Sequence, residues 1–218
     1  MHLEEQLKIL KQKVNKFTPK FIENIMNEAA TNLALLEIEK KALKLGDSAP
    51  AFVLVNAFGE RINSIELLKK GPLVINFYRG AWCPFCNLEL AAYQDVLPEI
   101  EALGGKLVAI SPELPDKSMT LSEKHKLKFQ ILSDTNNLIA REFGIVFTVD
   151  KKLRRLYRLM NINLSTSQGN KNYELPVPAT YIIDKNGVII LSHVDTDYTN
   201  RLDPSEVIKC LKAMQFNK

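Results

Sequence analysis

Apolar side chains in the first 45 residues recur at alternating intervals of four and three, the spacing of one helical face. One stripe comprises Leu3, Leu7, Leu10, Val14 and Phe17, and a second comprises Ile22, Met26, Ala29, Leu33 and Leu36. Thr18 and Pro19 are typical of a cap and a first-turn proline between two helices, and Gly46 is predicted to close the second. We therefore predict an N-terminal helical hairpin over residues 1–45. Its stripe could pack on its own domain or support a homodimer.

From residue 46 onwards, apolar runs typical of buried strands alternate with helix-like spacing. The predicted strands are Phe52–Val55, Leu73–Tyr78, Lys106–Ile110 and Phe129–Leu132, and the helices are Ser64–Lys70, Leu88–Ile100, Asp116–Lys126, Asn137–Phe143 and Pro204–Met214. Thr180–Ile183 and Val188–Leu191 flank an Asn-Gly turn and predict a hairpin. Residues 161–174 are rich in Asn, Ser, Gln and Gly and are expected to form a loop. The pattern predicts an α/β domain over residues 46–218, a central mixed sheet with helices on both faces.

Charge and hydropathy exclude several classes of protein. The net charge of +4 is small, and the basic run Lys151–Arg158 reads as a solvated amphipathic face, so no nucleic-acid partner is expected. The apolar runs are far shorter than the ~20 residues of a membrane helix, and the acidic, lysine-rich N-terminus does not resemble a signal peptide. We expect a cytoplasmic protein without a membrane partner.

The candidate chemistry lies in two cysteines, Cys83 and Cys86, which follow a predicted buried strand and open a helix. Free backbone N–H groups and the helix dipole favour a thiolate over a thiol at such a position. Two-residue spacing also allows a disulfide to close, and a sulfenic acid on one sulfur would be captured by the other. This Cys-x-x-Cys segment therefore predicts thiol redox chemistry.

Two other interpretations of the pair are a zinc half-site and buried structural thiols. A structural zinc site needs two further ligands, and the remaining candidates show no second paired spacing; they are His2, His125, His193 and Cys210. We therefore expect no metal and no cofactor. Cys210 is predicted to be a half-buried packing residue of the last helix.

Four segments carry a resemblance to a known family: Phe77–Cys86, Ile131–Asp134, Ala140–Gly144 and Pro176–Gly187. They resemble the peroxiredoxin-like branch of the alkyl hydroperoxide reductase/thiol-specific antioxidant (AhpC/TSA) family, from about residue 46 to residue 213. The resemblance implies a thioredoxin-like fold that reduces hydroperoxides through cysteine and is restored by thioredoxin or a small thiol.

The chain departs from that family's pattern at two places. Counted without gaps, Arg79 stands at the family's active-site proline, Cys83 at its threonine and Cys86 at its peroxide-attacking cysteine. Pro178 stands where the family carries an arginine, and it resembles the cis-proline of thioredoxins, although a turn proline is ordinarily trans. Arg79 is either a holder of the thiolate or the peroxide oxygens or a surface salt-bridge residue. Trp82 is expected to shield the site.

These observations lead to a thiol-dependent peroxidase, an oxidoreductase that reduces hydrogen peroxide or organic hydroperoxides through a Cys83/Cys86 dithiol–disulfide cycle. The alternatives are a thioredoxin-like protein disulfide reductase and a redox-sensing interaction module. The first nucleophile stays open from the sequence. The exposed end of the helix favours Cys83, whereas the ungapped family register favours Cys86, and we predict Cys83.

Overall fold

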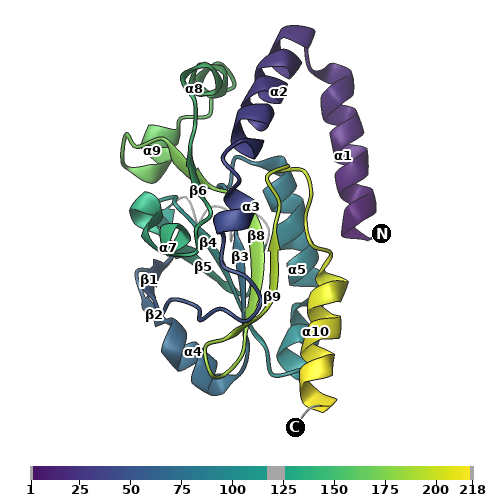
Figure 1. Cartoon of the computed structure of the whole chain (residues 1–218), viewed down its shortest axis with the longest axis vertical. Helices are drawn as coiled ribbons and strands as arrows, with labels where there is room; N and C mark the ends of the chain where they lie inside the picture. Colours follow the sequence, from purple (N-terminus) through teal and green to yellow (C-terminus); the bar gives the residue numbers. More distant parts are fainter. Residues whose placement is uncertain (1, 117–125, 217–218) are drawn as a thin grey trace.

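The computed structural model of the chain describes residues 2–116 and 126–216. A seven-stranded sheet in the order β2-β1-β5-β4-β3-β8-β9 forms its centre (Figure 1). The strands are β1 (Val53–Asn56), β2 (Arg61–Asn63), β3 (Leu73–Phe77), β4 (Lys106–Ser111), β5 (Gln130–Ser133), β8 (Ala179–Ile183) and β9 (Ile189–Val194). Parallel pairing joins β3 to β4 and β4 to β5, whereas β8 pairs antiparallel with both β3 and β9. The predicted mixed sheet is confirmed.

Alternation along β3 explains why the sheet needs helices on both faces. Leu73, Ile75 and Phe77 point into one hydrophobic cluster, and Val74 points into another on the opposite face. All five residues of the strand are buried. Burial of one such side chain is worth about 1.5–3 kcal/mol, so the strand is a rigid base for the segment that follows it.

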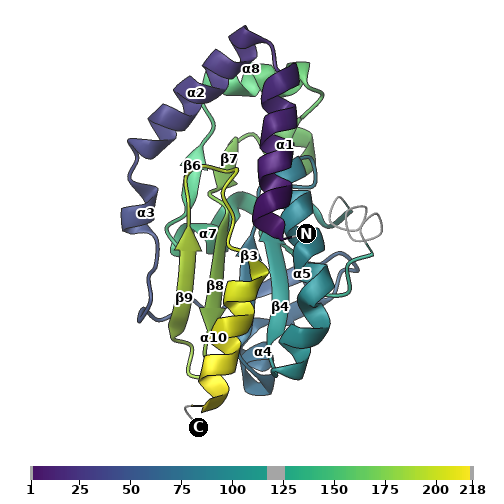
Figure 2. The ribbon, with the colours of Figure 1, turned by 90° about the vertical axis from the view of Figure 1, so that its right-hand side faces the viewer.

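Helices cover both faces of the sheet, as predicted. They are α1 (Leu3–Phe17), α2 (Lys20–Ala34), α3 (Ile38–Lys41), α4 (Ser64–Lys70), α5 (Pro84–Ala102), α7 (Leu138–Glu142), α8 (Lys151–Leu159), α9 (Leu164–Gln168) and α10 (Pro204–Phe216), with a 3₁₀ turn at Thr135–Asn137. Figure 2 looks onto the face covered by α1, α5 and α10. Residues of α3, α4 and α7 belong to the cluster on the other face.

The two N-terminal helices form a V rather than a pair packed along its length (Figure 1). Helix α1 packs on α5, and α2 packs on α8. Gly46 does not close the second helix, because α2 ends at Ala34 and a turn and α3 follow. Most residues of the apolar stripes contact this chain's own hydrophobic clusters, whereas Phe17 and Leu36 are 77% and 45% exposed.

The region between β5 and β8 departs most from the expectation. The predicted loop over residues 161–174 contains α9, and Asn163 caps it by accepting a hydrogen bond from the Thr166 N–H. Strands β6 (Val146–Thr148) and β7 (Glu174–Pro176) pair with each other outside the main sheet and were not predicted. Most of the predicted helix Asp116–Lys126 lies outside the described residues. The hairpin around the Asn-Gly turn is confirmed.

None of the helices in residues 2–116 and 126–216 combines the length and the apolar character needed to cross a membrane.

Candidate active site

The Cys-x-x-Cys segment lies where β3 ends and α5 begins. Gly80 makes the connection with a φ of 149°, and a Cβ there would lie 2.4 Å from Trp82 Nε1, so both backbone and space require glycine. The Ala81 N–H donates to Glu113 Oε2 at 2.7 Å. Cys83 is the N-cap of α5. The cysteine pair therefore starts a helix, as predicted.

The two thiols are buried together: Cys83 is 1% exposed and Cys86 0%. The expectation that Cys83 lies at an exposed end is wrong, because it packs in the same hydrophobic cluster as Cys86. Burial opposes ionisation of Cys83, but hydrogen bonding from Cys86 and the charges of Arg79 and Arg201 outweigh it and lower its pKa to about 6. Burial and the neighbouring Cys83 raise the pKa of Cys86 well above its ordinary value. One thiolate and one thiol thus share the site near neutral pH.

Arg79 lies in a cage of aromatic rings beside the cysteines. Its guanidinium carbon is 4.8 Å from the ring centre of Trp82 and 4.7 Å from that of Tyr198. The side chain is only 4% exposed and donates a hydrogen bond to the Tyr157 hydroxyl. Nε of Arg79 has no hydrogen-bond partner among the described residues. The geometry is that of a buried cation with one free donor, and the surface salt-bridge alternative is excluded.

A second buried arginine contacts the other sulfur. Arg201 Nη2 lies 3.4 Å from Cys86 Sγ, and Arg201 Nε lies 2.7 Å from Glu89 Oε2. The side chains of Arg201 and Glu89 are 1% and 2% exposed. Burial raises the pKa of Glu89 to about 7, against the lowering effect of Arg201. Asn76 donates to the other oxygen of Glu89 at 2.9 Å, so both carboxylate oxygens of Glu89 have a partner.

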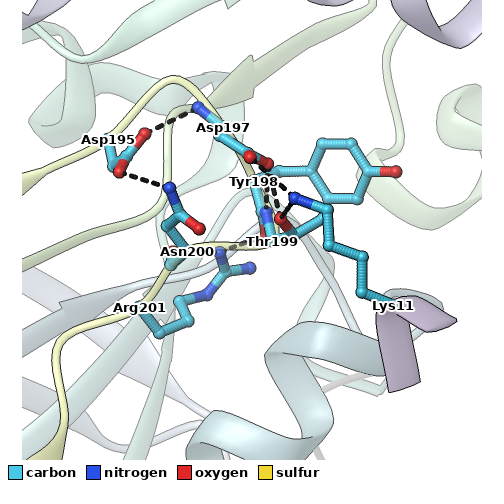
Figure 3. A network of polar contacts seen from close by, with 7 residues as sticks. All are labelled: Lys11, Asp195, Asp197, Tyr198, Thr199, Asn200 and Arg201. Atoms are coloured by element: carbon cyan, nitrogen blue, oxygen red, sulfur yellow. Dashed lines mark hydrogen bonds and ion pairs between the residues drawn. The ribbon is translucent and has the colours of Figure 1, made fainter. Parts of the chain in front are cut away.

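The loop after β9 positions Arg201 through a network of polar contacts (Figure 3). Arg201 Nη1 donates to the carbonyl oxygens of Tyr198 and Asn200. Asp197 accepts from the backbone N–H and the hydroxyl of Thr199 at 2.9 and 2.6 Å. Lys11 of α1 donates to Asp197 at 3.1 Å and to Thr199 at 2.9 Å. The N-terminal helix is therefore tied to the loop that supplies an active-site arginine.

Pro178 and Arg79 both line a small cavity of about 40 Å³. The expected cis peptide bond is wrong, because the Val177–Pro178 bond is trans. Val177 is fully buried, and its N–H donates to the Ile145 carbonyl at 2.7 Å. That backbone group is already paired within the chain and offers no edge for a substrate peptide.

The other predicted residues occupy defined places. Trp82 is half-buried and packs on Tyr157, with ring centres 5.3 Å apart. Tyr157 belongs to the basic run, which forms the amphipathic helix α8 as expected. Cys210 of α10 is half-buried and packs against the hydrophobic cluster that also contains Cys83 and Cys86, which confirms its packing role.

Sequence reasoning missed Glu89, Arg201, Tyr157 and Tyr198 as parts of the site. Glu89 could have been found, because it lies three residues after Cys86 on the same helix face. No local spacing links Arg201 or the two tyrosines to the cysteines, since they come from distant segments.

Comparison with known proteins shows that most of this chain matches one protein family. Residues 45–192 match the AhpC/TSA family. The chain is 28% identical to chloroplastic peroxiredoxin Q of Sedum lineare over 174 residues, 79% of this chain and 78% of that protein. It is 33% identical to peroxiredoxin Bcp of Escherichia coli K12 over 103 residues, 47% of this chain and 65% of that protein.

Solved structures share the fold. The peroxidoxin BcpB of Mycobacterium tuberculosis superimposes with a TM-score of 0.62 at 22% identity, covering 79% of this chain and 98% of that one. A peroxiredoxin-like protein from Aquifex aeolicus gives a TM-score of 0.60 at 18% identity over 79% of this chain and 88% of that one. The N-terminal residues that precede residue 45 lie outside the family match.

Proposed function

The chain belongs to the AhpC/TSA family, and from this membership we propose that it reduces hydroperoxides through a Cys83/Cys86 dithiol–disulfide cycle. The matches confirm the predicted family, the thioredoxin-like fold and the class of thiol-dependent peroxidase, an oxidoreductase. The assignment of the reacting residues is our proposal. The observation that carries it is the buried thiol pair, in which two arginines favour the thiolate form of Cys83.

In the first step, the Cys83 thiolate attacks the terminal oxygen of the hydroperoxide and the O–O bond breaks. Sulfur gives up two electrons and becomes a sulfenic acid, and the departing alkoxide takes a proton and leaves as an alcohol or as water. The free donor of Arg79 supports the reaction by hydrogen bonding to the peroxide oxygens, where negative charge develops.

In the second step, the Cys86 sulfur attacks the sulfenic sulfur, a disulfide forms and water leaves. Because the partners are two residues apart on one helix start, closure needs little backbone movement. An external dithiol then supplies two electrons and two protons and restores both thiols. We propose thioredoxin or a similar thiol as the reductant.

The alternative of a protein disulfide reductase keeps the Trp82–Cys86 segment but loses its second support, a cis peptide bond at Pro178. The Val177–Pro178 bond is trans, and the Val177 N–H donates to the Ile145 carbonyl, so this N–H is not free to pair with a substrate chain. Both sulfurs are also buried, which disfavours direct attack on the disulfide of a folded protein substrate.

A homodimer through the N-terminal helices and a cytoplasmic location stay predictions. The apolar stripes that suggested the dimer contact this chain's own clusters. Sedimentation of the full chain tests the dimer.

The proposed function is tested by stopped-flow fluorescence of Trp82, the only tryptophan, on mixing reduced protein with hydrogen peroxide or cumene hydroperoxide. We expect a fast signal whose rate rises linearly with peroxide, followed by loss of two hydrogens per chain in the mass spectrum. The Cys210→Ser variant is the matched thiol control and should behave like the natural chain. No disulfide after an excess of either peroxide would refute the proposal.

A further inference from the structure

Arg79 is a buried cation without a carboxylate partner. Its side chain is 4% exposed, and an arginine at such a position ordinarily pairs with an acid. In residues 2–116 and 126–216, however, no carboxylate forms an ion pair with it. Glu113, which lies beside Gly80, accepts from the Ala81 N–H. The aromatic rings around Arg79 offset only part of the cost of burying its charge, so an anion is needed beside it.

The second arginine brings further positive charge to the site. Arg201 donates to Cys86 Sγ at 3.4 Å and pairs with the buried Glu89. Burial raises the pKa of Glu89 to about 7, so near neutral pH this carboxylate carries only part of its charge. Two guanidiniums and one carboxylate leave at least one positive charge uncompensated. A thiolate on the cysteine pair is the anion that balances it.

Oxidation of the pair removes that anion. A disulfide between Cys83 and Cys86 carries no charge, so both guanidiniums lose their thiolate while they stay buried. The redox equilibrium of a dithiol depends on which of its two forms the surroundings stabilise. Stabilisation of the reduced form makes the disulfide a stronger oxidant.

We propose that the disulfide of this pair is an oxidising one: the two buried guanidiniums stabilise the reduced pair, so that a thiol of modest reducing strength, a monothiol included, is a sufficient reductant. The inference rests on the proposed function, in which Cys83 and Cys86 cycle between dithiol and disulfide, and it names the chemical class of the reductant. An oxidising pair is also a poor reductase of protein disulfides.

The reduction balances with two monothiol molecules. The first attacks one sulfur of the disulfide, so the bond between Cys83 and Cys86 breaks and a mixed disulfide forms. The second attacks the mixed disulfide and leaves with the first as a disulfide of their own. The pair gains two electrons. Of the two protons that the monothiols give up, one goes to the Cys86 sulfur and the other to solvent, because Cys83 stays a thiolate and again balances the guanidiniums.

Equilibration of the full-length protein with reduced and oxidised glutathione at neutral pH tests this inference. After acid quenching and alkylation, peptide mass spectrometry gives the ratio of reduced to disulfide form, with thioredoxin in the same mixture as the reference. We expect a ratio about fivefold higher than that of thioredoxin, because the pKa of Cys83 is about 6 and that of the thioredoxin cysteine is about 7. This comparison needs no variant.

Three replacements of arginine show whether charge is the cause. Arg79→Met should lower the ratio about three- to tenfold, because the thiolate loses one of its two cations. Arg79→Lys keeps the charge and should stay within about threefold of the natural chain. The matched control is Arg154→Met. Arg154 also lies against a ring, that of Tyr173 at 4.3 Å, but it donates to the Val149 carbonyl rather than to a sulfur, and its replacement should leave the ratio unchanged.

The inference is overturned if the natural chain is no more reduced than thioredoxin, if Arg79→Met keeps the natural ratio, or if Arg79→Lys falls as far as Arg79→Met. Because the equilibrium involves no peroxide, the proposed function stands in each of these cases when peroxide still produces the disulfide. If the ratios are as expected but peroxide produces no disulfide, the proposed function fails and the oxidising character of the pair remains.

Discussion

The active site joins two kinds of structure. The junction of β3 and α5 is local: Cys83, Cys86 and Arg79 lie within a few residues on a buried strand and the helix that follows it. The surroundings of this junction are assembled from α1, α2 and the loop after β9. That loop carries Tyr198 and Arg201. The local part holds the two sulfurs, and the assembled part adds the charge of Arg201 and the aromatic ring of Tyr198 beside Arg79. The burial and charge around the cysteines therefore depend on segments that are far away in the sequence.

The largest loss of stability is expected on replacement of Arg201, where the assembled part contacts the local part. Its replacement by Met leaves the buried Glu89 carboxylate without its counter-ion, and breaking such a pair costs about 3–5 kcal/mol. Urea unfolding of Arg201→Met against the natural chain measures that loss. The double variant Arg201→Met/Glu89→Gln should regain much of the stability, yet its thiol pKa should stay above that of the natural chain. Equal stability of Arg201→Met and the natural chain would show that the ion pair is not formed.

The local part can be disturbed at Gly80. An alanine there would need an unfavourable φ of 149° and would place its Cβ 2.9 Å from Glu113 Cδ, at an expected cost of about 1–3 kcal/mol. Gly59→Ala is the control, because that turn also has a positive φ, 83°, but nothing lies within 4 Å. Thermal unfolding of both variants should show the larger loss for Gly80→Ala. The same loss in both would mean that the close contact contributes nothing.

Arginines from both the local and the assembled part determine how the reaction of the Cys83 thiol depends on pH. Since Arg79 and Arg201 help to bring the pKa of Cys83 to about 6, the reaction with peroxide should accelerate as pH rises through 6 and level off above it. Well below that pKa the rate falls about tenfold for each pH unit, because only the thiolate reacts. Arg79→Met should move the midpoint upwards. A midpoint near the ordinary cysteine value of about 8.5 in the natural chain would contradict this charge arrangement.

The smallest effect is expected at the tie between α1 and the loop. Lys11 and Asp197 are 47% and 42% exposed, so their ion pair contributes less than about 1 kcal/mol. Lys11→Met should change stability as little as Lys209→Met, which removes another exposed pair. It should nevertheless lower the rate of the reaction with peroxide about twofold, because the loop that carries Arg201 to Cys86 is then less firmly held. A change beyond about 2 kcal/mol would indicate that the loop depends on this contact.

The division between local and assembled structure also explains what the sequence could predict. The apolar run of β3, the Asn-Gly hairpin and the helix start at the cysteine pair are encoded by neighbours in sequence, and these three structural predictions are confirmed. The burial of Cys83 depends on segments far away in the chain, and so its exposure was mispredicted. Strands β6 and β7 have three residues each and are separated in the chain by two helices, so no local sequence pattern predicts that they pair. The same holds for Arg201, whose place near Cys86 depends on the folded loop.

The most direct test of the central claim is the site of sulfenic acid formation. Reduced Cys83→Ser and Cys86→Ser variants are treated with hydrogen peroxide and a dimedone-type reagent, and the adduct is located by peptide mass spectrometry. We predict rapid modification of Cys83 in Cys86→Ser, with little reaction in Cys83→Ser, because Arg79 and Arg201 still favour the Cys83 thiolate when Cys86 is replaced and the serine hydroxyl can donate in place of the thiol. If Cys83→Ser forms the adduct at the rate of the natural chain while Cys86→Ser does not, Cys86 attacks first and the assignment is wrong.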